Sequence, residues 1–403
     1  MGAGIILFGL PLWLLIFPVL GLLIFVHEAG HFLTAKYFGI KVTEFGFGFP
    51  PRIFGIQRGE TTYTLNWIPL GGFVKMVGEE DPTEERSFAR QAVWKRAIVL
   101  VAGSFMNILT PLAIFTILFL LPQDTAVGNV VISGVAPGSP AQEAGIRAGD
   151  TVMSFDGERV KNHYSLIEMV MAKLDSPTEI TLRRGSIVTG LGQNLDSSVV
   201  ETVTVTPRLN PPKFLVVDEV ADADTEISLR DARRYDAQLG LGDTLTQGAV
   251  GVIIGTSNVR MVKESYPIWE AVPKAFDRMW NVLIITKNGF ERWISGGPDP
   301  GLTGPIGIAR VTGQVAEAGI APIFELTALI SISLGIMNIL PIPALDGGRL
   351  LFVMIEWARR GKRVSPQKEG VVHLAGFAVL IGFIVIISYF DVVRIISGER
   401  LIP

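Results

Sequence analysis

The sequence predicts a polytopic α-helical membrane protein, with about four transmembrane helices and an α+β domain inserted between the second and the third. Composition and hydropathy patterning carry this prediction. The 403 residues are 49% hydrophobic and only 18% charged, whereas soluble domains carry about 25% charged residues. Mean hydropathy is +0.43. The apolar residues are concentrated in four runs, each long enough to cross a hydrocarbon core of about 30 Å.

The four predicted spans are residues 5–26, 98–121, 323–345 and 371–390. The first lacks the basic flank and the small-residue cleavage site of a signal peptide, so we expect it to be retained. Four spans place both termini on one side of the membrane. The loop after the third span is strongly basic and is expected to be cytoplasmic; it contains Arg359, Arg360, Lys362, Arg363 and Lys368.

Residues 122–321 have 24 acidic and 18 basic side chains and therefore a net charge of −6. Since the basic loops are expected to be cytoplasmic, this segment and both termini are expected on the external, periplasmic side of the membrane. We expect a bacterial inner-membrane protein whose membrane part is residues 1–121 and 322–403. Residues 267–321 are expected to begin with an amphipathic helix, at 267–294, on the membrane surface. The alternative is a helix packed on the external domain.

Residues 122–266 are expected to form the external domain, because short alternating strands surround one helical stretch. Small-residue strings punctuate it: Ser139-Pro-Ala141, Ala144-Gly-Ile146, Gly149-Asp150 and Asp156-Gly157. These strings and the order of elements resemble a bacterial protease-associated PDZ domain. Such domains add an extended peptide to a sheet edge. The expected partner of this domain is therefore a peptide or a protein C-terminus.

The sequence His27-Glu28-Ala29-Gly30-His31 is the H-E-x-x-H pattern. Residues four apart share one face of a helix, so both histidines can bind one zinc ion. Glu28 is placed to exchange a proton with a water molecule at the site. The chain has no cysteine and only four histidines, so two of the four stand at metal-binding spacing. The alternative is a polar cluster at the membrane interface.

A catalytic zinc usually has three protein ligands. Asp346 is the candidate for the third, since it directly follows an apolar run and needs a counter-charge. The alternative role for Asp346 is a helix-end cap before a Gly-Gly turn. His163 and His373 are expected not to be ligands.

Taken together, H-E-A-G-H in the first span, N-x-x-P-x-P-x-L-D-G-G at residues 338–348 and a PDZ-like domain between them resemble the site-2 protease family. The closest type is the bacterial regulator-of-sigma-E protease. This family consists of intramembrane zinc metalloproteases that cut transmembrane segments of regulatory proteins, commonly anti-sigma factors already trimmed by another protease. Further strings with the same resemblance are residues 69–76, 102–107 and 304–309.

The resemblance implies that zinc (Zn²⁺) is bound by His27, His31 and Asp346 and that Glu28 is the general base and acid. It further implies that three residues of the third span line the site and hold the substrate: Asn338, Pro341 and Pro343. Two prolines interrupt a helix and free backbone carbonyl groups, which agrees with such a role. Helix–helix hydrogen bonding is the alternative for the asparagine.

Residues 63–76 alternate and then turn at 69–72, which predicts a β-hairpin. The resemblance makes residues 36–97 a membrane-re-entrant β-loop, with Gly71 and Gly72 contacting substrate; a plain cytoplasmic hairpin is the alternative. The sequence departs from some family members in showing one PDZ-like domain instead of two.

The expected function is therefore intramembrane proteolysis of single-span membrane proteins in the lipid bilayer. The main alternative is a catalytically inactive, membrane-anchored PDZ adaptor. A transporter is disfavoured because the spans show no internal repeat. The net charge of −3 argues against nucleic acid as a partner.

Overall fold

The structure of the chain, a computed structural model, describes residues 6–7, 10–79, 81, 83–185, 199–222, 225–233, 239–297 and 303–397. The chain divides into two compact units. The first comprises Met1–Leu121, Tyr266–Met279 and Gly301–Pro403, and the second comprises Pro122–Ser265 and Trp280–Pro300.

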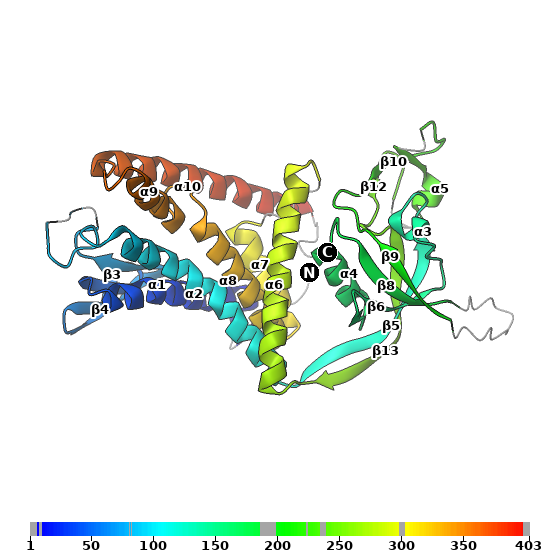
Figure 1. The fold of residues 1–403 in the computed structure, drawn as a ribbon, viewed down its shortest axis with the longest axis horizontal. Helices are drawn as coiled ribbons and strands as arrows, with labels where there is room; N and C mark the ends of the chain where they lie inside the picture. Colours follow the sequence, from blue (N-terminus) through cyan, green and yellow to red (C-terminus); the bar gives the residue numbers. More distant parts are fainter. Residues whose placement is uncertain are drawn as a thin grey trace. The chain divides into compact units, whose positions relative to one another are not determined.

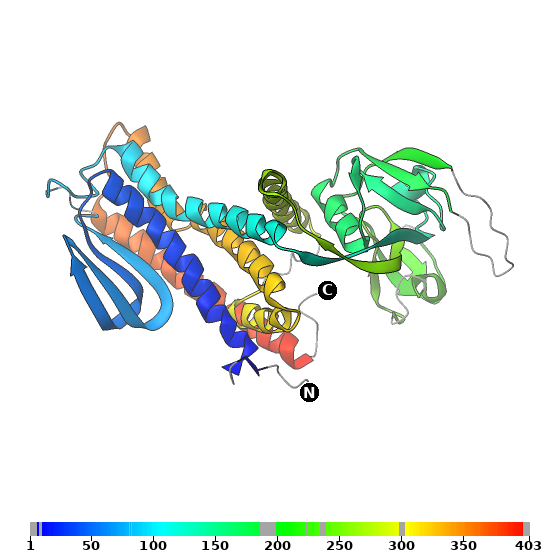
Figure 2. The same ribbon diagram turned by 90° about the horizontal axis from the view of Figure 1, so that it is seen from below.

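Within the described residues, four helices of the first unit are long and apolar enough to cross a membrane (Figures 1 and 2). They are α1 (Ile16–Tyr37), which continues the short 3₁₀ helix η1 (Leu12–Leu15), α2 (Val93–Leu120), α8 (Ile320–Ile339) and α10 (Pro366–Ser397). Two shorter helices join them, α7 (Pro305–Glu317) and α9 (Asp346–Ala358). The fold is that of a polytopic membrane protein with additional β-structure, as predicted.

The helix ends differ from the predicted spans. Among the described residues the first helical one is Leu12, and the strands β1 (Ile6–Leu7) and β2 (Leu10–Pro11) pair before it. Ile5, where the predicted span begins, lies outside the described residues. The third span ends at Ile339, six residues earlier than predicted, because proline at 341 and 343 cannot continue the helix. The helices α7 and α9 were not predicted.

Glycine residues let the spanning helices approach closely. A Cβ atom on Gly30 of α1 would lie 2.4 Å from the Ala102 carbonyl oxygen of α2. On Gly335 of α8 it would lie 2.8 Å from the Ile108 side chain of α2. Small residues allow this backbone approach in membranes, where packing replaces the hydrophobic effect as the main attraction between helices. The helix α2 is therefore packed against both α1 and α8.

A buried ion pair joins α2 to α9. Nη2 of Arg96 lies 2.6 Å from Oε1 of Glu356, and both residues are buried. Arg363 also reaches the Glu356 carboxylate, at 3.3 Å. This ion pair therefore holds α9 (Asp346–Ala358) against the bundle of α1, α2 and α8, and so helps to position its first residue, Asp346.

A sheet made of two long strands lies beside α1 (Figure 2). The strands are β3 (Val42–Arg58) and β4 (Thr61–Met76). The two strands form four paired segments. Residues 42–47 pair with residues 72–76 on one side, and residues 44–47 pair with residues 62–65 on the other; residues 54–58 pair with residues 61–65. The predicted hairpin over 63–76 is therefore wrong in its pairing. The chain does turn between the two halves of β4, but both halves flank β3 and do not pair with each other.

The second unit is an α+β structure. Its main sheet has the order β13 (Val252–Glu264), β5 (Gln123–Val135), β6 (Thr151–Phe155), β8 (Thr178–Arg183) and β9 (Val200–Val205), with β7 (Glu158–Arg159) paired to β6. The helices α3 (Pro140–Glu143) and α4 (His163–Ala172) belong to the same unit. Buried side chains such as Ile132, Phe155 and Leu182 form its core. Its identification as a PDZ domain stays a prediction.

A smaller sheet in the second unit has the order β11 (Glu226–Ser228), β10 (Lys213–Val217) and β12 (Thr244–Thr246), with α5 (Leu229–Ala232) following β11. The smaller sheet was not predicted.

The predicted amphipathic helix is present as α6 (Ile268–Ile294). Its last turns are fixed by a hydrogen bond from Asn288 to the Met171 carbonyl oxygen, 2.9 Å long.

Candidate metal centre

Two buried histidine side chains on α1 face each other. His27 and His31 stand one helical turn apart, with ring centroids separated by 4.8 Å and Nε2 atoms by 3.1 Å. This follows from the four-residue spacing, which places both side chains on one face of the helix.

Asp346, the first residue of α9, completes the group. Its Oδ2 atom lies 3.0 Å from Nε2 of His27 and 3.2 Å from Nε2 of His31. No other set of three histidine, aspartate or glutamate side chains in the described ranges could hold a metal ion. The structure therefore brings together the three residues that the sequence singled out as ligands.

Two glycines explain how Asp346 reaches the histidines. A Cβ atom on Gly347 would lie 2.0 Å from the Leu340 carbonyl oxygen, and one on Gly348 would lie 2.4 Å from that of Ile342. The first turn of α9 can therefore sit directly on the backbone that follows α8 only because both residues lack side chains. Asp346 begins a helix and does not cap the preceding one, which ends at Ile339.

The donor set fits a zinc ion. Nδ1 of His31 lies 2.7 Å from the Val99 carbonyl oxygen, which can only accept a hydrogen bond, so Nδ1 carries the proton and Nε2 presents a lone pair. Two imidazole nitrogens and a carboxylate oxygen then converge within 3.2 Å. This is a ligand set that zinc prefers, and a cation relieves the mutual repulsion of their lone pairs.

Asn107 of α2 contacts the other ring. Its amide Nδ2 lies 3.3 Å from Nδ1 of His27, and its Oδ1 is buried without a partner in the described part of the chain. A half-turn of the amide lets Oδ1 accept the Nδ1 hydrogen of His27, which leaves Nε2 free to bind metal. The backbone carbonyl oxygen of Asn107 accepts a hydrogen bond of 2.7 Å from the Ser331 hydroxyl group of α8.

Gly103 forms the wall behind the two rings. A Cβ atom there would lie 2.3 Å from Nε2 of His31 and 2.7 Å from Nε2 of His27. The space beside the candidate ligand nitrogens thus depends on this glycine. It belongs to the string at 102–107, but its contact with the histidines could not be deduced from spacing.

Glu28 stands next to both histidines and is partly buried. The strand β4 passes directly over it, since a Cβ atom on Gly72 would lie 2.9 Å from Cγ of Glu28. Gly71 has a φ of 109° and is packed against the ring of Phe49, so only glycine fits this turn. Gly72 is therefore beside the predicted base, whereas Gly71 shapes the turn that leads to it.

The remaining predicted residues lie at the end of α8 and just beyond. Asn338 is in the last turn of α8 and partly buried. Pro341 is exposed in the following loop, and Pro343 packs against α10, where a Cβ atom on Gly376 would lie 2.3 Å from Cβ of Pro343. The structure brings this loop to the start of α9, next to Asp346.

The sequence missed the role of His373. Its Nδ1 accepts a hydrogen bond of 2.9 Å from the Ala344 backbone N–H, two residues before Asp346. Ala344 has a φ of 80°, a conformation that costs energy for a residue with a Cβ atom. His373 thus holds the loop in place. His163 lies in the second unit, where its Nδ1 is 2.7 Å from Oγ1 of Thr256.

Comparison with known proteins identifies the family. The model of peptidase family M50, the site-2 proteases, matches residues 15–383. The chain belongs to peptidase family M50. This M50 chain is 30% identical over 391 residues to a protein of Rhizobium meliloti that is named as a candidate zinc metalloprotease. The alignment covers 93% of this chain and 94% of the relative. The chain is 29% identical over 464 residues to the zinc metalloprotease RasP of Geobacillus kaustophilus, covering 93% and 96%.

A third relative, from Fusobacterium nucleatum, is 32% identical over 388 residues and is also named as a candidate zinc metalloprotease. The chain is thus a zinc metalloprotease of the site-2 type, with zinc as its cofactor and membrane-spanning helices around it. The predictions of family, enzyme class and cofactor are confirmed.

Proposed function

We propose that this M50 peptidase is an intramembrane endopeptidase. Its proposed substrates are the transmembrane segments of single-span membrane proteins, such as anti-sigma factors already shortened by another protease. The observation that carries the proposal is the position of His27 and His31, which stand within a helix (Leu12–Tyr37) long and apolar enough to cross a membrane. Ionisable groups at membrane depth are costly and are retained for function.

In the proposed mechanism, His27, His31 and Asp346 hold zinc, which when bound supplies Lewis acidity to the scissile carbonyl and to water. Glu28 accepts the proton of the attacking water molecule and then delivers it to the leaving nitrogen, so that one carboxylate serves both halves of the hydrolysis. The absence of a side chain at Gly72 favours this role, because a Cβ atom there would lie 2.9 Å from Cγ of Glu28 and press on that side chain.

The substrate must be extended at the cut, because a helix buries its own peptide bonds. We propose that the segment 72–76 of β4 pairs with it. In the register of β3 and β4 this segment pairs on one side only, with residues 42–47. A peptide added to its free side begins beside Gly72 and therefore beside Glu28. Asn338 and the loop through Pro341 and Pro343 are proposed to hold the opposite side.

We propose that the metal centre lies toward the cytoplasm, with both termini and the second unit outside the inner membrane. The basic residues after α9 support this orientation. Arg359 and Lys362 are exposed there, at the end of the helix that begins with Asp346, as the positive-inside rule predicts for a cytoplasmic loop.

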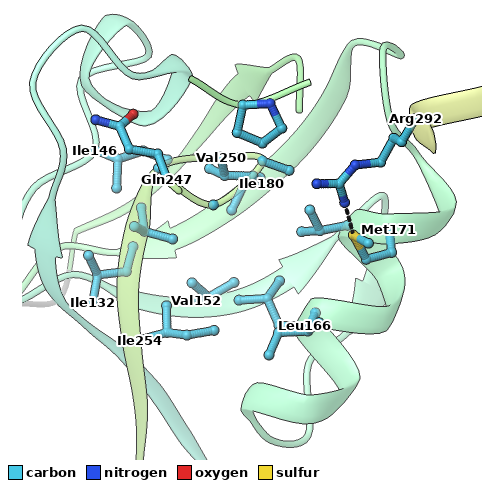
Figure 3. Close-up of a pocket in the computed structure, with 17 residues that line it drawn as sticks. Ile132, Ile146, Val152, Leu166, Met171, Ile180, Gln247, Val250, Ile254 and Arg292 are labelled. Carbon is cyan, nitrogen blue, oxygen red and sulfur yellow. Dashed lines mark hydrogen bonds between the residues drawn. The ribbon is translucent and has the colours of Figure 1, made fainter. Parts of the chain in front are cut away.

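The second unit is proposed to bind a peptide or a protein C-terminus, as a PDZ domain does. The strand β13 lies at the edge of its sheet, and an apolar cavity of about 320 Å³ opens between β13, α4 and residues 247–251 (Figure 3). Arg292 of α6 points to the cavity, with Nη1 4.0 Å from Sδ of Met171. A peptide carboxylate would match its charge.

Reconstitution into lipid vesicles tests the proteolytic function. The wild-type chain is expected to cut a labelled single-span protein within its apolar segment, and Glu28→Gln is expected to keep zinc and lose cleavage. Zinc is expected to be lost in Asp346→Ala. Cleavage retained by Glu28→Gln would rule out the mechanism, and cuts confined to exposed loops would rule out intramembrane proteolysis. In cells, single-span proteins that accumulate with Glu28→Gln would identify the substrates.

A further inference from the structure

An apolar groove in the first unit lies away from the metal centre. It has a volume of about 940 Å³ and is lined by the start of the first span, by α7 and by the end of α10. Its apolar lining includes Leu12, Ile16, Leu20, Ile306 and Ile395. Along α1, the eleven residues from Ile16 to His27 correspond to about 16 Å. The groove therefore belongs to the opposite half of the membrane from the ligand histidines.

The helix α7 is fixed in place beside this groove. Asp391 of α10 is fully buried, and its Oδ2 accepts a hydrogen bond of 2.8 Å from the backbone N–H of Gly307 in the first turn of α7. A carboxylate at a helix N-terminus is stabilised by the helix dipole. A Cβ atom on Gly307 would lie 2.9 Å from Oδ1 of Asp391, so the contact is too close for any side chain. The groove is therefore a built feature of the unit.

Arg310 lines the same groove one turn further along α7. Its Nη1 is buried and has no hydrogen-bond partner among the described residues. Glu317 also lines the groove but is exposed and forms no ion pair with Arg310 in the part of the chain that the structure describes. An arginine donor left unpaired in apolar surroundings is costly.

We propose that this groove binds a membrane phospholipid, with an acyl chain along the apolar wall and the headgroup phosphate on Arg310. The location supports this occupant, since Leu12 begins the first span and the ends of transmembrane helices lie at the level of lipid phosphates. Arginine binds phosphate through several charge-assisted hydrogen bonds. A phospholipid thus supplies both the apolar chain and the anion that the groove lacks. The proposal is independent of the proposed proteolytic function.

Binding of defined lipids to the delipidated full-length chain, measured by native mass spectrometry, tests the proposal. The probes are phosphatidylglycerol, phosphatidylethanolamine and a diacylglycerol with the same acyl chains. Wild type is expected to bind one phospholipid at the groove, about tenfold more tightly than diacylglycerol, which lacks the phosphate. Arg310→Gln is expected to abolish that difference. Arg359→Gln, an exposed arginine outside the groove, is the matched control and is expected to behave as wild type.

A second pair of variants tests the apolar wall. A Cβ atom on Gly313 would lie 3.4 to 3.5 Å from atoms of Trp13, which is ordinary contact. Gly313→Ala is therefore expected to fold and to bind lipid normally, and Gly313→Leu to fill the groove and lose the lipid. Equal phospholipid binding by Arg310→Gln and wild type, or by Gly313→Leu and Gly313→Ala, would overturn the proposal. An unchanged lipid affinity together with a raised KM for substrate cleavage in Gly313→Leu would also overturn the proposal, because that result would assign the groove to the substrate.

Discussion

The substitution Gly103→Ala is expected to abolish zinc binding although it changes no ligand. The added Cβ atom would lie 2.3 Å from Nε2 of His31 and 2.7 Å from Nε2 of His27. Non-bonded atoms pack at about 3.5 Å, so the rings must withdraw by about 1 Å. The hydrogen bond of 2.7 Å between Nδ1 of His31 and the Val99 carbonyl oxygen of α2 opposes this withdrawal. Zinc–ligand distances vary by only about 0.2 Å between sites.

Zinc content per chain and competition with a chelator measure this effect in the purified protein. We expect a loss of affinity greater than the roughly 10- to 100-fold change caused by removing one outer hydrogen bond to a ligand. Gly382→Ala is the matched control, because it makes the same change within α10 and its Cβ atom would meet no other atom within 4 Å. One zinc per chain at wild-type affinity in Gly103→Ala would refute the reasoning.

Three further substitutions each test one contact described by the structure. Asn107→Ala removes the partner of a ligand histidine and is expected to lower zinc affinity by about 10- to 100-fold with little change in Tm, as chelator competition and thermal unfolding will show. Glu356→Ala leaves Arg96 buried without its partner at 2.6 Å and is expected to cost about 3–5 kcal/mol. The double variant with Arg96→Met should recover much of this loss in denaturant unfolding. Glu60, whose pKa is lowered from 4.5 to about 2 by hydrogen bonds from Arg86 and Lys36, contributes stability above pH 4.5 that is lost as the pH falls through about 2. The Tm difference between wild type and Glu60→Gln is therefore expected at pH 7 and should shrink below pH 4.5, to be lost as the pH falls through about 2.

The spans and the grouping of the proposed metal ligands could be predicted because both depend largely on local patterns. Four apolar runs give four helices, and the four-residue spacing of His27 and His31 is sufficient to place them on one face. Asp346 was predicted from a single acidic residue after an apolar run. The distance of 3.0 Å between Asp346 and His27 could not be predicted, since it depends on close contacts of Gly347 with the end of α8.

The remaining features depend on contacts between distant segments. The pairing of residues 44–47 with both halves of β4 is not encoded in the alternation of either half. The contact of His373 with Ala344 joins α10 to a loop 29 residues away, and a single histidine in a helix gives no sign of it. Similarly, the start of α9 at Asp346 was missed because a Gly-Gly pair usually indicates a turn, whereas here it allows close backbone packing.

The separation of the ligands along the chain has a consequence for biosynthesis. His27 and Asp346 are 319 residues apart, with the whole second unit synthesised between them. A nascent chain that has inserted α1 and α2 contains both histidines and Glu28 but lacks the third ligand. The metal centre is therefore incomplete until α8 has entered the membrane and α9 has packed on α2. This zinc metalloprotease thus becomes active only when its own membrane insertion is nearly finished.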